Sequence, residues 1–226
     1  MLFNLIIFFS LGFVIIFSTF FITYFPFISF FTDLSSYSSF VITYSNSLFS
    51  IGYFQSNLQI PVVILVSLLL NPYLNFIFML SYLILGFFKY PIFYYGGGMD
   101  YIQQDSVGYI LSFLPVSIMI SNLAWRKNRQ KYLFNTKYLF SISILGLILI
   151  HLIGMGILFI RFNFSNFSDF LRLAQIYFFI PILSQVMLVY VFTIFSVLVN
   201  RFKFFIFENY NMLISHKITN EKSTKP

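Results

Sequence analysis

Apolar residues fill most of the chain in long, nearly unbroken runs, which short polar segments separate. The hydrocarbon core of a bilayer needs about 20 apolar residues per helix, and a helix that is apolar on every side belongs in lipid or in a protein interior. The pattern predicts an all-α, polytopic membrane protein with about six transmembrane helices. The predicted spans are residues 2–24, 58–70, 74–88, 107–125, 138–160 and 173–200.

The second and third runs are short and meet at Asn71-Pro72. Proline cannot continue a helix and restricts the residue before it. This favours a turn between two helices, and the alternative is one span that kinks at the proline.

The two ends of the chain carry different expectations. Residues 2–24 are too long for a signal-peptide core and lack a basic start and a small-residue cleavage site, so we expect a retained helix. Residues 1–205 form the expected six-helix domain, and residues 206–226 form a polar cytoplasmic tail that we expect to be disordered at its end. Residues 31–49, a mixture rich in Ser and Tyr, suggest an amphipathic cap or a flexible loop.

Basic residues set the expected orientation. Five of them lie between Arg126 and Lys137, the densest basic loop, which the positive-inside rule places in the cytoplasm. An even number of crossings separates this loop from both termini, so both termini are expected inside. Arg201 and Lys203 agree with this orientation. Residues 31–49, 89–106 and 161–172 then face outward.

Composition supports a membrane protein and excludes several classes. Hydrophobic residues make up 59% of the chain and charged residues 8%, against roughly a quarter charged in soluble domains. There is no Cys, which excludes disulfides, Cys-ligated zinc and iron–sulfur clusters. The net charge of +7 sits at the ends of apolar runs, which indicates lipid headgroups as partners and not nucleic acid.

Known catalytic signatures are missing from the sequence. It holds no Gly-x-Ser-x-Gly elbow, no HExxH zinc motif and no Walker A loop. We therefore expect a protein without enzyme activity, cofactor or metal that binds a small molecule for import. A partner would have to supply energy for uphill transport.

The outward segment 89–109, KYPIFYYGGGMDYIQQDSVGY, looks like a binding loop. Glycines allow positive φ and close approach of main-chain N–H groups to a ligand, and aromatic rings offer flat faces. The alternative is a tight external turn flanked by interfacial tyrosines. The candidate residues are Tyr94, Tyr95, Gly96, Gly97, Gly98 and Tyr109.

His151 lies in the middle of the fifth predicted span. An ionisable residue within a membrane span is a candidate functional residue. The alternative is a neutral imidazole that hydrogen-bonds another helix, with Gly154 and Gly156 allowing close packing. No second His or carboxylate shares the span to form a relay or a metal site.

Amides and cations supply the remaining candidates. Gln59 opens the second span and Gln185 follows Pro181 in the sixth, and both can donate and accept hydrogen bonds to a neutral polar group. Interhelical hydrogen bonding is their alternative role. Lys89 or Arg172 is a possible partner for a substrate carboxylate, and snorkelling to headgroups is the alternative for each.

From residue 58 onward the order of motifs resembles the BioY family, the biotin-specific substrate-binding (S) components of energy-coupling factor transporters. The segment QDSVGYILSFLPVSIMISNLAWR is similar to the family's Pro-(Ser/Thr)-x-Gly-Tyr-Leu segment, and the later His and Gln resemble the cyanobacterial form. The positions that carry the resemblance are Gln59, Asn71-Pro72, Tyr82-Leu83, Gly86, Pro91, Phe93, Gly96, Gly97, Gly98, Ser106, Gly108, Tyr109 and Phe113.

The resemblance implies a six-helix domain that binds biotin near its outer face, with Tyr82, Phe93 and His151 among the contacts. It also implies a transmembrane (T) component and two ATPase subunits as partners, and a cell membrane or plastid inner envelope location. The alternatives are an S component or permease for another vitamin, and a membrane-embedded enzyme or structural subunit. The chain departs from the family in two places. Many members carry an Asp and a Lys at the start of the last helix, where this chain has Ile182, Leu183, Ser184 and Gln185. The small-residue Ala pair with which the first helix docks to the T component is absent, and the first helix offers only Ser10, Gly12 and Ser18.

Overall fold

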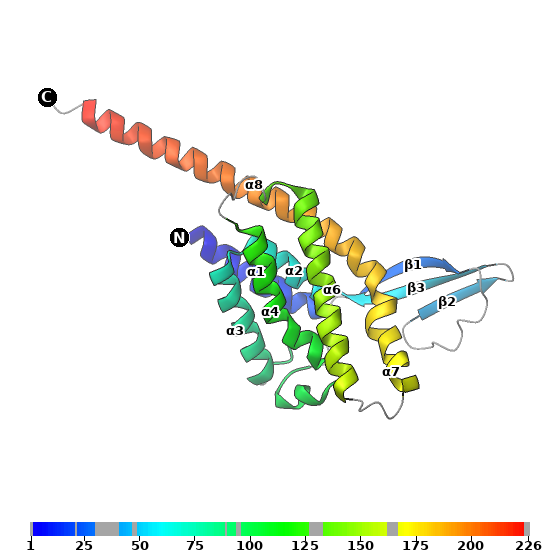
Figure 1. Ribbon diagram of the computed structural model, residues 1–226. Coiled ribbons are helices and arrows are strands. Elements are labelled where there is room, and N and C mark those ends of the chain that lie inside the picture. The colour runs from blue at the N-terminus through cyan, green and yellow to red at the C-terminus, as the bar shows by residue number, and fades with distance from the viewer. Residues whose placement is uncertain are drawn as a thin grey trace.

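A computed structural model describes residues 2–20, 22–29, 41–46, 49–88, 90–93, 96–126, 133–161 and 167–223 (Figure 1). In chain order the elements are α1 (Leu2–Phe20), β1 (Ile22–Ser29), β2 (Val41–Asn46), β3 (Phe49–Asn57), α2 (Gln59–Leu69), α3 (Pro72–Phe88), the 3-10 helix η2 (Met99–Gln103), α4 (Val107–Ala124), α6 (Thr136–Arg161), α7 (Phe167–Ala174), the π-helix η3 (Gln175–Phe179) and α8 (Ile180–Ser223).

The apolar helices α1, α2, α3, α4, α6 and α8 coincide with the predicted spans and confirm the helical membrane fold. In the part of the chain whose side chains are described, three stretches are long and apolar enough to cross a membrane: Val107–Ala124, Thr136–Arg161 and Tyr177–Ile206. The shorter apolar stretches there are Phe9–Ser18, Gln59–Leu69 and Pro72–Phe88. Large apolar side chains such as Phe13, Leu152 and Leu198 remain exposed on the outer surface, as a protein with lipid as its solvent requires.

Helix α2 is the centre of the helical bundle. Every one of its residues is buried, and it contacts α1, α4, α6 and α8. At 11 residues, it rises only about 16 Å, so it does not span a bilayer core alone. Its uniformly apolar sequence reflects burial by other helices on all sides.

The junction between α2 and α3 is a turn between two helices, not a kink. Leu70 has extended backbone angles and ends α2. The Asn71 side-chain oxygen accepts a hydrogen bond from the Leu74 N–H at 3.0 Å, and Pro72 is the first residue of α3. An Asn cap followed by Pro in the first turn is a favoured helix start, so the local sequence fixes this break.

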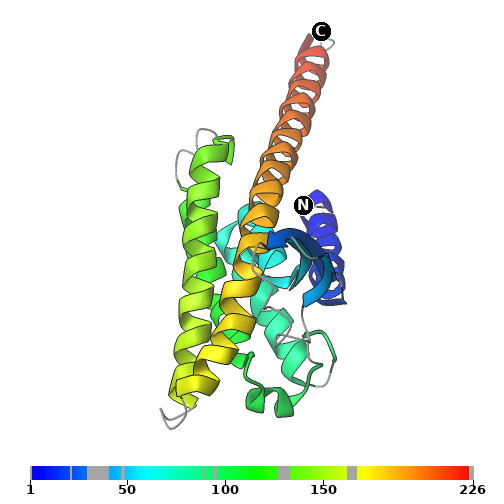
Figure 2. The ribbon, with the colours of Figure 1, turned by 90° about the vertical axis from the view of Figure 1, so that its right-hand side faces the viewer.

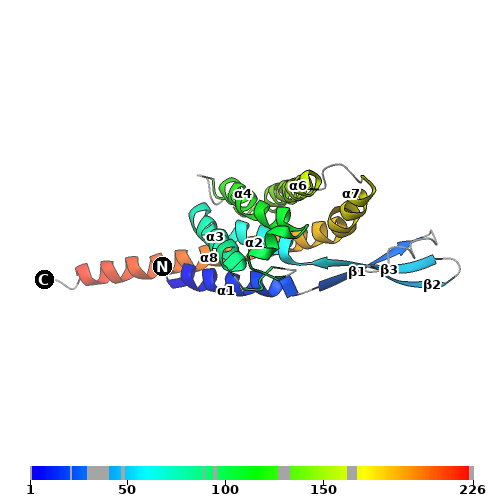
Figure 3. The same cartoon turned by 90° about the horizontal axis from the view of Figure 1, so that it is seen from below.

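A three-stranded antiparallel sheet of order β1-β3-β2 lies between α1 and α2 in the chain. It was not predicted, and reading residues 31–49 as a cap or loop is wrong for residues 41–46 and 49, which lie in β2 and β3. Ile, Val, Thr, Tyr and Phe favour strands, and Pro26 lies in β1, an edge strand, where proline is tolerated. Figure 3 shows the sheet extending away from the helices.

Two helices end at residues other than those predicted. Helix α1 ends at Phe20 instead of residue 24 because β1 begins at Ile22. Helix α8 continues to Ser223, through the segment expected to be a separate tail. The sequence from residue 182 to 225 contains neither Gly nor Pro to stop it. The division into a membrane domain and a cytoplasmic tail stays a prediction.

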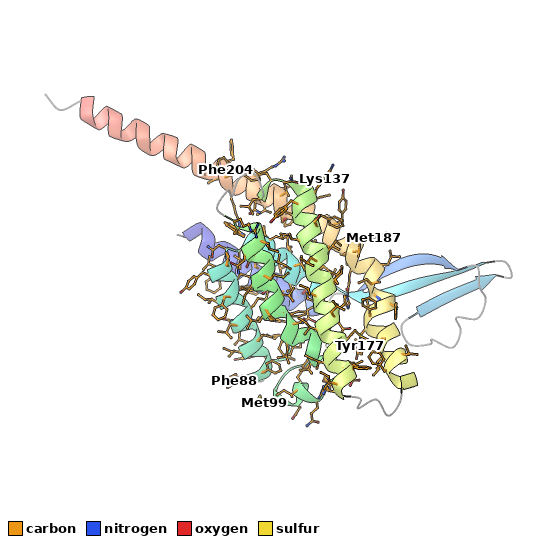
Figure 4. The ribbon with its side chains drawn as sticks, in the orientation of Figure 1. Phe88, Met99, Lys137, Tyr177, Met187 and Phe204 are labelled. Carbon is orange, nitrogen blue, oxygen red and sulfur yellow. The ribbon has the colours of Figure 1, made fainter. Side chains whose placement is uncertain are left out.

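The segments that connect the helices gather at two opposite ends. Figure 4 places Phe88, Met99 and Tyr177 toward one end, and Lys137 and Phe204 at the other. Figure 2 shows the start of α1 and the far end of α8 toward the end where α6 begins. The first end, which we call the loop end, holds η2, the end of α6 and α7.

Candidate functional site

The first polar group, the loop network, connects α2, α3 and the segment before η2. The buried Gln59 amide Nε2 donates a hydrogen bond to the Tyr82 hydroxyl at 2.6 Å. That hydroxyl donates in turn to the main-chain oxygen of Ile92 at 3.2 Å. Gln59 and Tyr82, both predicted as site residues, are therefore brought together, and Gln59 makes the interhelical bond that the alternative predicted.

Phe93 anchors the segment between α3 and η2 to the helices. Its ring centroid lies 5.4 Å from that of Tyr82, 5.3 Å from that of Phe87 and 4.8 Å from that of Tyr101. The Tyr101 hydroxyl shares a hydrogen bond of 2.8 Å with the Ser106 hydroxyl. Edge-to-face ring packing is favourable beyond area burial alone, so this cluster holds η2 against the start of α4.

The three glycines of the loop have different roles. Gly96 and Gly98 have positive φ, at 112° and 90°, which only glycine adopts without strain. A Cβ on Gly97 would collide with the main-chain carbonyl group of Tyr90. The Gly98 N–H donates to the Gly86 carbonyl oxygen at 2.8 Å. We expected Gly97 to let the backbone come close to a ligand. In the structure it lets the backbone come close to that of Tyr90.

The second polar group, the core network, lies between α6 and α8. His151 Nε2 and the Gln185 oxygen Oε1 are 2.7 Å apart, and both side chains are almost fully buried. Because an amide oxygen only accepts, Nε2 carries the proton, and Nδ1 is left as an acceptor. Within the described residues, buried Nδ1 has no hydrogen-bond partner, which is uncommon for a buried polar atom.

Aromatic rings surround the imidazole. The His151 centroid lies 5.5 Å from that of Tyr109 on α4 and 5.2 Å from that of Phe178 on η3, both edge-to-face. The Tyr109 ring also packs over Gly154, where a Cβ would come within 2.7 Å of ring carbons. The spacing of Gly154 after His151 on α6 therefore places Tyr109 beside the imidazole.

A π-helix adjoins the core network at the start of α8. Proline has no N–H, so Pro181 cannot donate the α-helical hydrogen bond to the carbonyl oxygen of Tyr177, four residues earlier. The Tyr109 hydroxyl lies 3.5 Å from that oxygen and is directed to donate to it. Single π-turns inside helices are frequent at functional sites. Here the π-turn η3 positions Tyr177 and Phe178 beside Tyr109 and His151.

Some predicted site residues lie beyond the reach of the structure. Lys89, Tyr94 and Tyr95 are outside the described residues. Arg172 lies in α7, and its side chain is not described. Their proposed roles in binding stay predictions.

The structure also adds residues that the sequence analysis did not select. Tyr101 contacts Phe93 of the loop network, and Tyr177 and Phe178 contact Tyr109 and His151 of the core network. Arg161 donates hydrogen bonds to the η2 segment. Because 23% of the chain is aromatic, the sequence alone does not distinguish these aromatic residues from the many others. Pro181 did carry a signal, because its missing N–H interrupts regular α-helical hydrogen bonding to residue 177.

Together the two networks offer neutral hydrogen-bonding groups in contact with aromatic rings. Amide, imidazole and hydroxyl groups can donate to and accept from an uncharged polar ring system, and aromatic faces cover apolar parts of a ligand. In the described part of the chain no cluster of three or more His, Asp or Glu side chains could hold a metal ion. The arrangement suits recognition of a small neutral ring system.

Comparisons with known proteins agree with this description. Residues 28–203 match the BioY family. The chain is 37% identical over 106 residues to "Probable biotin transporter BioY" of Pyrococcus horikoshii. This alignment covers 46% of this chain and 59% of that protein. The chain is 29% identical over 106 residues to the protein of the same name from Lysinibacillus sphaericus, which covers 47% and 52%. The aligned part thus spans little more than half the length of these curated relatives.

A solved structure shares the fold. The crystal structure of the S-component for biotin from an ECF-type ABC transporter superposes with a TM-score of 0.55 at 17% identity, covering 65% of this chain and 76% of the other. At that identity the likeness concerns the arrangement of the helices.

Proposed function

The chain belongs to the BioY family, and from this premise we propose that it is the biotin-binding S component of an energy-coupling factor transporter. The observation that carries the proposal is the buried His151–Gln185 pair, with the unpartnered Nδ1 of His151. An acceptor held among aromatic rings inside a membrane domain is complementary to the N–H group of an uncharged ring system.

Biotin matches this arrangement part by part. Its ureido ring offers N–H donors to His151 Nδ1 and a carbonyl oxygen to the Gln185 amide N–H2 group. Its apolar thiophane ring fits the faces of Tyr109, Tyr177 and Phe178. The loop network of Gln59, Tyr82 and Phe93 holds the segment that carries Gly96 and Gly98 against α3. In this proposal the imidazole and amide take the place of the Asp and Lys that many relatives carry.

The test is calorimetry on the purified full chain in nanodiscs, without ATP. We expect saturable heat with biotin, no ATP hydrolysis by the chain alone, and no heat with thiamine or riboflavin. A response to another vitamin and none to biotin would keep the transport class and reject the substrate. A chain that turns over a ligand would support the enzyme alternative.

The site is tested with Gln185→Ala in the same assay. The variant should lower biotin affinity about five- to 150-fold, because it leaves His151 and the ligand without a buried hydrogen-bond partner. Met187→Ala is the matched control, since Met187 lies about half a helical turn after Gln185 on α8 and is 54% exposed. If Gln185→Ala binds biotin as the parent does, the core network is not the site.

Partners and location follow from the same proposal. We expect the chain to copurify with a T component and two ATPase subunits from a cell membrane, or from a plastid inner envelope in a plastid-bearing cell. The cyanobacterial type is proposed from His151 and Gln185 together. Gentle purification followed by mass spectrometry tests this, and a chain that accumulates biotin in proteoliposomes without any partner would contradict it.

A further inference from the structure

Arg161 is the last residue of α6 and is bonded directly to the η2 segment. Its Nη1 donates to the main-chain oxygen of Gln104 and its Nη2 to that of Ile102, each at 2.6 Å. Two short bonds from one planar group fix its position, so little side-chain freedom remains to be lost when another group binds.

Among the described side chains, this guanidinium has no ion-pair partner. Both groups that it contacts are neutral carbonyls. Asp100 and Asp105 flank them in the sequence, and neither carboxylate pairs with Arg161 in the part of the chain that the structure describes. A guanidinium has five N–H donors in a fork that matches a carboxylate, so donors remain at the exposed loop end.

Arg161 continues the face of α6 that carries the core network. His151, Gly154, Leu158 and Arg161 follow at steps of three, four and three residues, which places them on one face of a helix. The first three of them are buried. Ten residues separate His151 from Arg161, or about 15 Å along the helix axis. Along this line the groups change from a neutral polar pair, through the Tyr109 ring over Gly154, to a cation at the loop end.

We propose that Arg161 binds the carboxylate of the substrate and thereby sets its orientation, with the ring system toward His151 and Gln185 and the acid toward the loop end. The inference rests on the proposed biotin-binding function. Because Arg161 also holds η2, carboxylate binding and the position of this segment are coupled. Lys89 and Arg172 are then not needed as the carboxylate partner.

The experiment compares biotin with biotinamide, its uncharged amide, on the full chain in nanodiscs. The parent should bind biotin more tightly than biotinamide. Arg161→Gln should lower biotin affinity about tenfold to 100-fold and leave biotinamide affinity unchanged, so that the preference disappears. Arg161→Lys should keep part of it. Arg201→Gln, an exposed arginine near the opposite end, should keep all of it.

Two results would overturn the inference while leaving biotin binding intact. One is an Arg161→Gln variant that keeps the parent's preference for biotin. The other is an equal loss of both ligands, which would make Arg161 only a clasp for η2. If the parent itself binds neither ligand, it is the proposed function that fails.

Discussion

Gly97 was predicted to let the backbone approach a ligand, and the structure shows a packing requirement at the same position. Its Cβ position is filled by the main chain of Tyr90, and the Gly86 oxygen lies within 2.9 Å of it. Gly96 and Gly98 have open space there and are needed for their positive φ. Gly97 therefore serves the packing of the loop segment on the end of α3.

Gly97→Ala should lower the stability of the protein by about 1 to 3 kcal/mol, because a methyl group forces the two backbone segments apart. Thermal melting in detergent measures the effect. Gly156→Ala is the matched control, since nothing lies within 4 Å of its Cβ position and alanine favours a helix by up to about 1 kcal/mol. A Gly97→Ala variant that melts with the parent would contradict the assignment.

At the scale of elements, side chains of α8 donate hydrogen bonds to the carbonyl groups at the end of α2. The last carbonyl groups of a helix have no partner within it. Lys203 Nζ donates to the Leu69 oxygen at 3.0 Å, and Asn200 Nδ2 lies 3.5 Å from the Leu68 oxygen and is directed to donate to it. A cation is also favourable at a helix C-terminus. The central helix is therefore tied to α8 at the end opposite the candidate site.

Lys203→Met should lower the stability of the protein by about 1 to 3 kcal/mol, because it leaves the Leu69 carbonyl without its donor. Arg201→Met, which changes an exposed neighbour on the same helix, should melt close to the parent. Biotin affinity should stay within a few-fold in both. Equal melting of all three proteins would show that the Lys203 bond contributes nothing measurable.

At the scale of the whole molecule, the fold places described parts of two of the three expected outward segments at the loop end. Segment 89–106 includes η2, and segment 161–172 includes the end of α6 and the start of α7; the structure brings both together through Arg161. The start of α6 and the far part of α8 lie toward the other end (Figure 2). The side of the membrane that each end faces stays a prediction from the charge pattern.

We predict that both termini are cytoplasmic, because the loop 126–137 holds five basic residues and no acidic one. Alkaline phosphatase fused after Lys225 should be inactive, since it folds only outside the cytoplasm. The same enzyme inserted after Asn166 should be active. Activity at residue 225 would reject the even number of crossings.

Much of the helical fold was readable from the chain, because lipid imposes one requirement on every spanning segment. Backbone groups must be satisfied within the segment, so each long apolar run becomes a helix. Asn71 and Pro72 likewise fix their break locally. The sheet was missed because its segments mix polar and aromatic residues, and pairing between strands depends on partners far apart in the chain.

The sequence by itself therefore determined the class of protein, the positions of the long apolar helices, and the residue types able to recognise a small ring system. Only the tertiary structure decided which of them meet. Gln59 pairs with Tyr82 and Gln185 with His151, and Arg161 reaches the η2 segment across 57 and 59 residues of chain. Hydrophobicity specifies that a helix is buried but not against which neighbour, since packing is a property of two surfaces together.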